Sequence, residues 1–240
     1  MKAIIFSAGL GTRFKPWTDQ HPKALAPVHG KSLLQHNVEY LQQYGIRDLI
    51  VNVHHFADQI EHAISSSNGW GSRILISDER NEVLETGGGL AKAQHLFTPG
   101  EDFLSINVDI LTNLDLHNFI RFHQQQEALI SLAVSDRKSS RCFLFNEENR
   151  LTGWRNTQTN QERIALPCAE PRPMAFSGIS LFRYEYFELI EMKGKFSLVD
   201  AFLSLAATHF IAGFDTGAVK WADVGRPESV AVAEALFPAS

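Results

Sequence analysis

Short apolar runs alternate with helix-like segments over the first part of this chain, and this alternation constrains the fold more than any other feature. The apolar runs lie at residues 3–7, 49–53, 73–77 and 103–108. The helix-like segments lie at residues 32–45, 56–64 and 89–96. Strands that alternate with helices form a parallel sheet through right-handed crossovers, with helices on both faces. We therefore expect an α/β fold with a mostly parallel central sheet flanked by helices.

The pattern changes after about residue 135. Strand-like runs at residues 141–146, 151–155 and 176–182 are separated by polar turns, which predicts small antiparallel additions. Residues 156–173 are polar and proline-rich, as in a lid or a surface excursion. Helical patterns return at residues 198–207 and 228–236. We expect one domain over residues 1–240, whose ligands bind beyond the carboxyl ends of the parallel strands.

A glycine-rich loop follows the first strand. Gly9 and Gly11 remove side-chain bulk where a backbone must approach phosphate groups closely, although a simple tight turn also needs glycine. Arg13 favours the phosphate interpretation, because a guanidinium offers paired donors to phosphate oxygens. Lys23 lies ten residues further on, between Pro22 and Pro27, and adds a second cation. The loop is therefore a candidate phosphate cradle.

Asp109 ends the apolar strand at residues 103–108, which places its carboxylate at the same edge of the sheet. Mg²⁺ prefers oxygen ligands and bridges substrate phosphates, so Asp109 is a candidate metal ligand. The alternative is a cap for the helix that follows.

These motifs resemble the signature of the sugar-1-phosphate nucleotidyltransferases, which make a nucleotide-diphosphate sugar from a nucleoside triphosphate and a sugar 1-phosphate. The matching stretches are Gly9-x-Gly11-Thr12-Arg13-x-x-Pro16 and Pro22-Lys23-x-Leu25-x-Pro27. The resemblance implies a Rossmann-like sheet and Mg²⁺ as cofactor. It implies that Arg13, Lys23 and Asp109 are catalytic and that Ala8, Gly9, Gly11, Thr12 and Arg13 bind the nucleotide. It also implies a nucleotide-binding half at residues 1–135 and a sugar-phosphate-binding half at residues 136–240.

The stretch Trp221-x-Asp223-x-Gly225 is similar to a second motif of that family. The two acids are 223 − 109 = 114 positions apart, so they form one metal site only if the fold reunites them. The resemblance implies that Asp109 and Asp223 both hold the metal.

A second glycine-rich stretch, Glu85-Thr86-Gly87-Gly88-Gly89, suits either a helix-entry turn or a close backbone approach to a nucleobase. It is similar to the branch of the family that makes UDP-N-acetylmuramic acid in cell-wall recycling. That branch implies UTP as donor and Gly87 and Gly88 beside the base. It places Glu85, Asn107 and Gly178 with the sugar phosphate.

Many relatives carry a Glu-Lys-Pro whose lysine grips the sugar phosphate, and this chain has Gly153-Trp154-Arg155-Asn156 instead. Arg155 is our candidate replacement. Its alternative is an exposed arginine at a strand end, and the competing cations are Arg137, Lys138 and Arg141. We assign no role to His54 and His55.

Composition excludes several function classes. A net charge of −5 gives no basic field for nucleic acid. No apolar run reaches the roughly 18 residues of a membrane span, so we expect a cytoplasmic protein that binds no membrane. Cys142 and Cys168 are expected to be free thiols. We expect a monomer or weak homodimer.

Four other functions share parts of this pattern. The enzymes are a guanylyltransferase for mannose or heptose 1-phosphate, a cytidylyltransferase and a glycosyltransferase. The last usually has an Asp-x-Asp, whereas Asp109 precedes Ile110-Leu111. A non-catalytic regulatory subunit that binds a nucleotide sugar is the fourth. The intact set of Arg13, Lys23, Asp109 and Asp223 argues against it.

Overall fold

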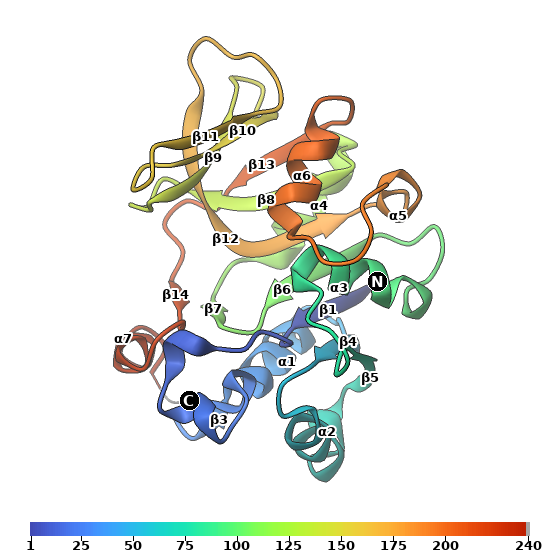
Figure 1. Cartoon of the computed structure of the whole chain (residues 1–240), viewed down its shortest axis with the longest axis vertical. Coiled ribbons are helices and arrows are strands. Elements are labelled where there is room, and N and C mark those ends of the chain that lie inside the picture. Colours follow the sequence, from blue (N-terminus) through green and yellow to red (C-terminus); the bar gives the residue numbers. More distant parts are fainter. Residues whose placement is uncertain (239–240) are drawn as a thin grey trace.

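The four apolar runs of the first half form parallel strands, as predicted. A computed structural model describes residues 1–238 of the chain. The strands are β1 (Lys2–Phe6), β4 (Asp48–Val53), β5 (Arg73–Asp78) and β6 (Phe103–Asn107). They lie in the order β6-β1-β4-β5, and each neighbouring pair is parallel. Their carboxyl ends therefore meet at one edge of the sheet (Figure 1).

The second half continues this sheet through β12 (Arg172–Phe182), which is antiparallel to β6. On its other side β12 pairs with β8 (Ile130–Ser135). The first residues of β12 pair with an antiparallel group in the upper part of Figure 1, formed by β9 (Arg141–Phe145), β10 (Leu151–Asn156) and β11 (Gln161–Ile164). The predicted antiparallel additions are confirmed.

The second half also departs from the predictions at two places. β13 (Ile211–Asp215) pairs in parallel with β8, and neither strand was predicted. The segment at residues 156–173, predicted as a lid or excursion, contributes β11 to a hairpin with β10.

Helices cover both faces of the sheet. On one face lie α1 (Leu33–Gln43), α2 (Ala57–Ser66) and α4 (Leu116–Gln126). On the other lie α3 (Glu85–Lys92), α5 (Tyr186–Leu189) and α6 (Leu198–Ala206). The last helix, α7 (Glu228–Leu236), packs beside the amino-terminal loops (Figure 1). None of the helices within residues 1–238 is both long and apolar enough to cross a membrane.

Two hydrophobic cores, one on each face, explain why the strands are apolar throughout. Successive side chains of a strand point to opposite faces. In β1, Ala3 and Ile5 belong to the core with α1 and α2, whereas Ile4 and Phe6 belong to the core with α3 and α6. Continuous apolar runs are typical of strands buried on both sides.

Local capping agrees with the helix boundaries predicted from sequence. The Ser32 hydroxyl accepts a hydrogen bond from the Gln35 N–H at 3.1 Å and caps α1, as expected from its position. Ser197 and Asp200 form a reciprocal capping box at the start of α6. Cys142 and Cys168 are free, as predicted.

Candidate active site

A cavity of about 410 Å³ lies at the carboxyl edge of the parallel strands. The loops that follow β1, β5 and β6 contribute to its wall, and so does Asn52 near the end of β4, as expected for an open α/β sheet. The predicted site residues in this wall are Ala8, Gly9, Gly11, Thr12, Arg13, Lys23, Glu85, Asn107 and Asp109. The fold therefore brings residues from position 8 to position 109 to one cavity.

Gly11 is required by its surroundings as well as by its backbone. Its φ is +60°, and a Cβ at this position would lie 2.8 Å from the Thr18 methyl group and 3.1 Å from the Cβ of Lys23. The Thr18 hydroxyl donates to the Gly11 carbonyl at 3.0 Å. The loop thus packs directly on the segment that carries Lys23, which explains how cations ten positions apart reach one cavity.

The first N–H groups of this loop are engaged within the protein. The Asn52 Oδ1 accepts a hydrogen bond from the Ser7 N–H at 2.7 Å and from the Ala8 N–H at 3.3 Å. Ala8 therefore lines the cavity with its N–H turned toward Asn52. In this conformation the Ala8 N–H is occupied, and the predicted binding of the nucleotide by this loop stays a prediction.

Lys23 forms an ion pair with Asp109 in the cavity. Lys23 lies on a 3₁₀ turn (Lys23–Leu25), and its side chain is 11% exposed. The side chain of Asp109 is 20% exposed. The two predicted catalytic groups are in direct contact and remain accessible to a ligand.

A two-stranded ribbon reunites the two predicted metal ligands. It consists of β7 (Ile110–Thr112) and β14 (Trp221–Asp223), and it pairs Asp223 with Ile110. The Val224 N–H donates to the Asp109 carbonyl at 2.8 Å. A Cβ on Gly225 would lie 2.7 Å from Asp223 Oδ1 and 3.3 Å from Arg13 Nη2. Two acids 114 positions apart in sequence (223 − 109) thus converge beside Arg13.

The electrostatics of this corner suit a cation. Desolvation of the Asp223 carboxyl group, followed by the negative charge of Asp109, raises the pKa of Asp223, and Lys23, Arg13 and Arg137 oppose the rise. No group of three or more histidine, cysteine or acidic side chains in residues 1–238 forms a metal cluster. Two carboxylates fit Mg²⁺, which keeps waters and binds substrate phosphates.

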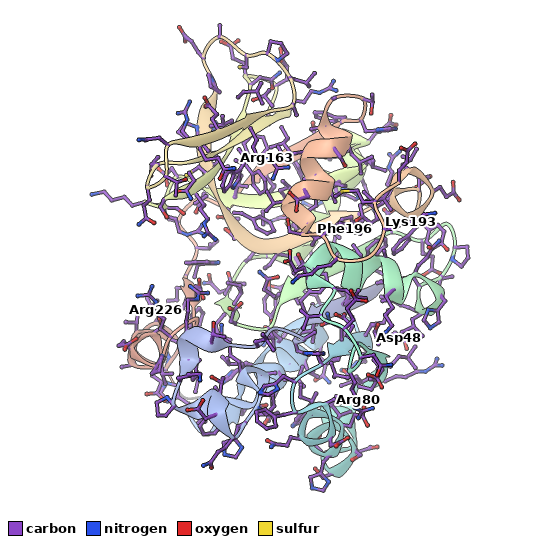
Figure 2. All side chains as sticks on the ribbon, viewed as in Figure 1. Asp48, Arg80, Arg163, Lys193, Phe196 and Arg226 are labelled. Atoms are coloured by element: carbon purple, nitrogen blue, oxygen red, sulfur yellow. The ribbon has the colours of Figure 1, made fainter. Side chains whose placement is uncertain are left out.

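The three glycines at residues 87–89 lie inside α3, so the expectation that the helix begins at Gly89 was wrong. Neighbouring groups lie too close to these glycines for a larger residue. A Cβ added to Gly87 would lie 2.4 Å from the Phe196 ring, and one added to Gly88 would lie 2.2 Å from the Gly194 carbonyl oxygen. Figure 2 shows Phe196 over this part of the molecule. Within residues 1–238, the cavity wall contains Glu85 and Thr86 but neither Gly87 nor Gly88. Close packing accounts for these glycines, and their predicted contact with the base stays a prediction.

Asn107 and Gly178 lie together at the end of β6. Gly178 has a φ of +80°, and a Cβ there would lie 2.7 Å from Ile110 Cγ1 and 3.2 Å from Asn107 Nδ2. Glu85 also has a positive φ, of 60°, and pairs with Lys195 at 3.8 Å. The predicted sugar-phosphate residues other than Arg155 therefore lie at or beside the cavity.

Arg155 is paired elsewhere. Its guanidinium on β10 donates to the Glu162 carboxylate on β11 at 2.6 and 2.9 Å. Arg155 is absent from the cavity wall formed by residues 1–238. Its competitor Arg137 lies 3.7 Å from the centre of the Trp221 ring and donates to the Phe176 and Ala175 carbonyls. Neither arginine is free in this conformation.

Sequence reasoning missed Asn52, Glu79 and His54. Asn52 donates to Glu79 Oε1 at 2.8 Å, and His54 Nδ1 lies 2.7 Å from the Glu79 carbonyl. Burial raises the pKa of Glu79, whereas hydrogen bonds from Asn52 and the Leu84 N–H oppose the rise. A usable signal was present: Asn52 is the one polar residue in the apolar run at residues 49–53, and a polar group inside a core needs a partner.

Comparisons with known proteins agree with this geometry. Residues 2–238 match the model of the family described as nucleotidyl transferase. The chain is 30% identical to the N-acetylmuramate alpha-1-phosphate uridylyltransferase of Caulobacter vibrioides, over 97% of this chain and 95% of the relative. It is 36% identical to the mannose-1-phosphate guanylyltransferase catalytic subunit beta of Xenopus tropicalis, over 95% of this chain and 62% of the relative.

The fold also matches a solved structure. That structure is HddC from Yersinia pseudotuberculosis, complexed with GMP-PN, with a TM-score of 0.79 at 23% identity over 97% of both chains. At this identity the likeness supports the Rossmann-like fold alone.

Proposed function

This chain belongs to the nucleotidyl transferase family and is a sugar-1-phosphate nucleotidyltransferase, and from this premise we propose that it transfers the uridylyl group of UTP to N-acetylmuramate 1-phosphate. The supporting observation is that Arg13, Lys23 and Asp109 line one cavity and that Asp223 lies next to Arg13 at its rim, together with a full-length relative of that name. The product serves cell-wall recycling in the cytoplasm, and the enzyme acts as a monomer or weak dimer.

The triphosphate binds at the loop after β1. N–H groups from Gly9 onward and the Arg13 guanidinium donate to its oxygens. Lys23 neutralises Asp109 before the donor binds and turns to the phosphates when they arrive. Both cations then stabilise the charge that develops on the leaving pyrophosphate.

The reaction is an in-line displacement. An oxygen of the sugar phosphate forms a bond to the α-phosphorus, and the bond from that phosphorus to the oxygen bridging the α- and β-phosphates breaks. The electron pair leaves with pyrophosphate. A phosphate monoester is already ionised near pH 7, so no side chain has to remove a proton from it.

Asp109 and Asp223 are the residues that would hold Mg²⁺. When bound, the ion supplies neutralisation of the crowded phosphate charges. The two carboxylates would hold it on the side of the cavity where Arg13 lies. The metal dependence rests on the chemistry of these oxygen donors.

A guanylyltransferase is the second candidate, because the relative from Xenopus tropicalis is 36% identical over 95% of this chain. It would use the same cations and acids, so the base and the sugar alone separate the two functions. A purely regulatory subunit is disfavoured, because binding without catalysis does not need the complete phosphate and metal apparatus.

The test is a panel of the four nucleoside triphosphates against sugar 1-phosphates, with pyrophosphate release as the readout. We expect release with Mg²⁺, UTP and N-acetylmuramate 1-phosphate, and loss of release when either substrate or the metal is withheld. Preference for GTP and mannose 1-phosphate would overturn the substrate assignment. No release with any pair would overturn the reaction itself.

A further inference from the structure

Asn52 and Glu79 form a buried polar pair in the wall of the nucleotide cavity. Asn52 lies near the end of β4, and Glu79 directly follows β5. Asn52 is 2% exposed and Glu79 is 0% exposed. The Glu79 side chain is thus covered within the wall, and its effect on the reaction passes through the neighbours that it holds.

Asn52 connects this pair to the phosphate loop. Its Oδ1 accepts hydrogen bonds from the Ser7 and Ala8 N–H groups at 2.7 and 3.3 Å, and its Nδ2 donates to Glu79 Oε1 at 2.8 Å. Glu79 thereby selects the orientation of the amide, because only Nδ2 can donate to a carboxylate. The oxygen must then face the loop, where it holds the backbone at Ser7 and Ala8, directly before Gly9, which lines the cavity.

The second carboxylate oxygen of Glu79 reaches the opposite wall. Glu79 Oε2 accepts a hydrogen bond from the Leu84 N–H at 3.3 Å, at the start of α3. A Cβ on Gly89 would lie 2.6 Å from Glu79 Oε1, so this glycine leaves room for the carboxylate. One side chain therefore connects the phosphate loop with the segment that carries Glu85 and Thr86.

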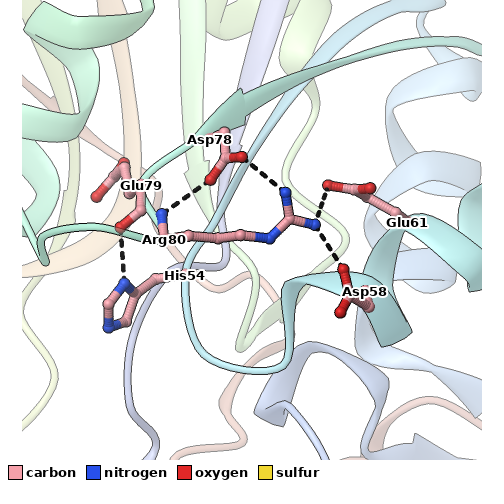
Figure 3. A network of polar contacts seen from close by, with 6 residues as sticks. All are labelled: His54, Asp58, Glu61, Asp78, Glu79 and Arg80. Atoms are coloured by element: carbon pink, nitrogen blue, oxygen red, sulfur yellow. Dashed lines mark hydrogen bonds and ion pairs between the residues drawn. The ribbon is translucent and has the colours of Figure 1, made fainter.

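The backbone of Glu79 is held from three directions. The Glu79 N–H donates to the Val53 carbonyl at 2.7 Å, and His54 Nδ1 lies 2.7 Å from the Glu79 carbonyl (Figure 3). The neighbouring Arg80 pairs with Asp58 and Glu61 of α2 at 2.7 and 2.8 Å (Figure 3). This anchoring limits how far the carboxylate can move from Asn52.

We propose that Asn52 and Glu79 are positioning residues that set the spacing of the two walls of the nucleotide cavity and the direction of the phosphate loop. The proposal rests on nucleotidyl transfer by this site, but on no particular base or sugar. It assigns to the pair an effect on the nucleoside triphosphate and none on the sugar phosphate, because the side-chain hydrogen bonds of the pair go to Ser7, Ala8 and Leu84 and, within residues 1–238, none goes to Asn107 or Gly178. It also gives His54 a role, in holding Glu79.

Exchanging the donor and the acceptor of this pair tests the proposal. Asn52→Asp keeps an oxygen for Ser7 and Ala8 but sets a carboxylate against that of Glu79. Glu79→Gln places an NH₂ group against one of the two donors that Glu79 accepts from, Asn52 Nδ2 or the Leu84 N–H. We expect each single change to raise the KM for the triphosphate about tenfold or more, as for a lost buried charge-assisted hydrogen bond, with the KM for the sugar phosphate unchanged.

The double variant Asn52→Asp with Glu79→Gln restores a complementary pair in reverse, at the same net charge. We expect its KM for the triphosphate to return to within a few-fold of the wild-type value. Thr152→Val is the matched control, because it removes a buried hydrogen bond of 3.0 Å to the Leu144 carbonyl far from the cavity. It should lower the melting temperature without changing either KM.

Two results would overturn the proposal: single variants with the wild-type KM for the triphosphate, or a double variant no better than the worse single. If Asn52→Asp does not fold, the nearly isosteric Glu79→Gln decides the first point. Titration calorimetry with the magnesium triphosphate measures donor affinity without turnover. An inactive wild type would therefore count against the proposed function, while the affinities still decide the role of the pair.

Discussion

The donor and acceptor sides of the cavity differ in how their polar groups are held. On the proposed donor side, Asn52 accepts hydrogen bonds from the Ser7 and Ala8 N–H groups and donates to Glu79, while Gly9, Gly11, Thr12 and Arg13 line the cavity. On the acceptor side, Arg155 is paired with Glu162, and Arg137 is held by backbone carbonyls. The proposed donor side is therefore preorganised, whereas Arg155 or Arg137 would have to change partners to bind a sugar phosphate.

Two buried titratable groups of the chain behave in opposite ways. Burial raises the pKa of Glu79. Burial and then Arg183 lower the pKa of His123, which lies on α4 and contacts the Ser131 hydroxyl of β8, to about 4. Glu79 therefore lowers the free energy of unfolding as the pH rises above the ordinary pKa of a glutamate. His123 lowers it as the pH falls below the ordinary pKa of a histidine.

The largest expected effect concerns the two predicted metal ligands, of which each half of the chain contributes one. Asp109→Ala and Asp223→Ala should each lower kcat by about a thousandfold or more, since metal-centred charge stabilisation is worth several kcal/mol. Asp48→Asn is the control, because Asp48 lies at the amino end of β4, away from the cavity (Figure 2). Steady-state kinetics and thermal melts measure the outcome. A near-normal rate would remove that acid from the site.

The next effect is on stability. An ordinary histidine pKa of 6.5 and a folded value of about 4 mean that the unfolded chain binds more protons between these pH values. The free energy of unfolding should thus fall by up to about 3 kcal/mol between pH 7 and pH 4 through His123 alone. Urea titrations of His123→Gln should show a flatter pH dependence over this window. His62→Gln, on the exposed face of α2, should not; equal slopes in both variants would contradict the assignment.

The smallest effect tests the acceptor side. If Arg155 leaves Glu162 to bind the sugar phosphate, Arg155→Ala should raise the KM for that substrate about tenfold, which corresponds to about 1.4 kcal/mol. Glu162→Gln should lower the same KM, because it releases the guanidinium. Arg163→Ala is the matched control. Arg163 lies on β11, the strand next to β10, and forms an ion pair of 2.6 Å with Asp200 of α6. An unchanged KM in Arg155→Ala would return the role to Arg137, Lys138 or Arg141.

The predictions are accurate where a feature depends on residues close together in sequence, and they fail where it depends on contacts between distant segments. Strands at residues 3–7 and 49–53 were predicted correctly, because their apolar character reflects burial between two cores. The start of α3 was misplaced, because glycine disfavours helices and only the contacts of Phe196 and Gly194 show why it is tolerated at residues 87–89. Strand β13 was missed because its pairing with β8 is long-range.

By itself, the sequence determined the α/β class and indicated the candidate phosphate loop and the two candidate metal ligands, because these depend on local periodicity and on residue chemistry. The tertiary structure decided which groups meet. The ribbon of β7 and β14 brings Asp109 and Asp223 together, and Asn52 accepts a hydrogen bond from the Ala8 N–H. Glu162 forms an ion pair with Arg155. Such partners are selected by proximity in the folded chain, and hydrogen bonds and ion pairs act over only a few ångströms, so no sequence pattern records them.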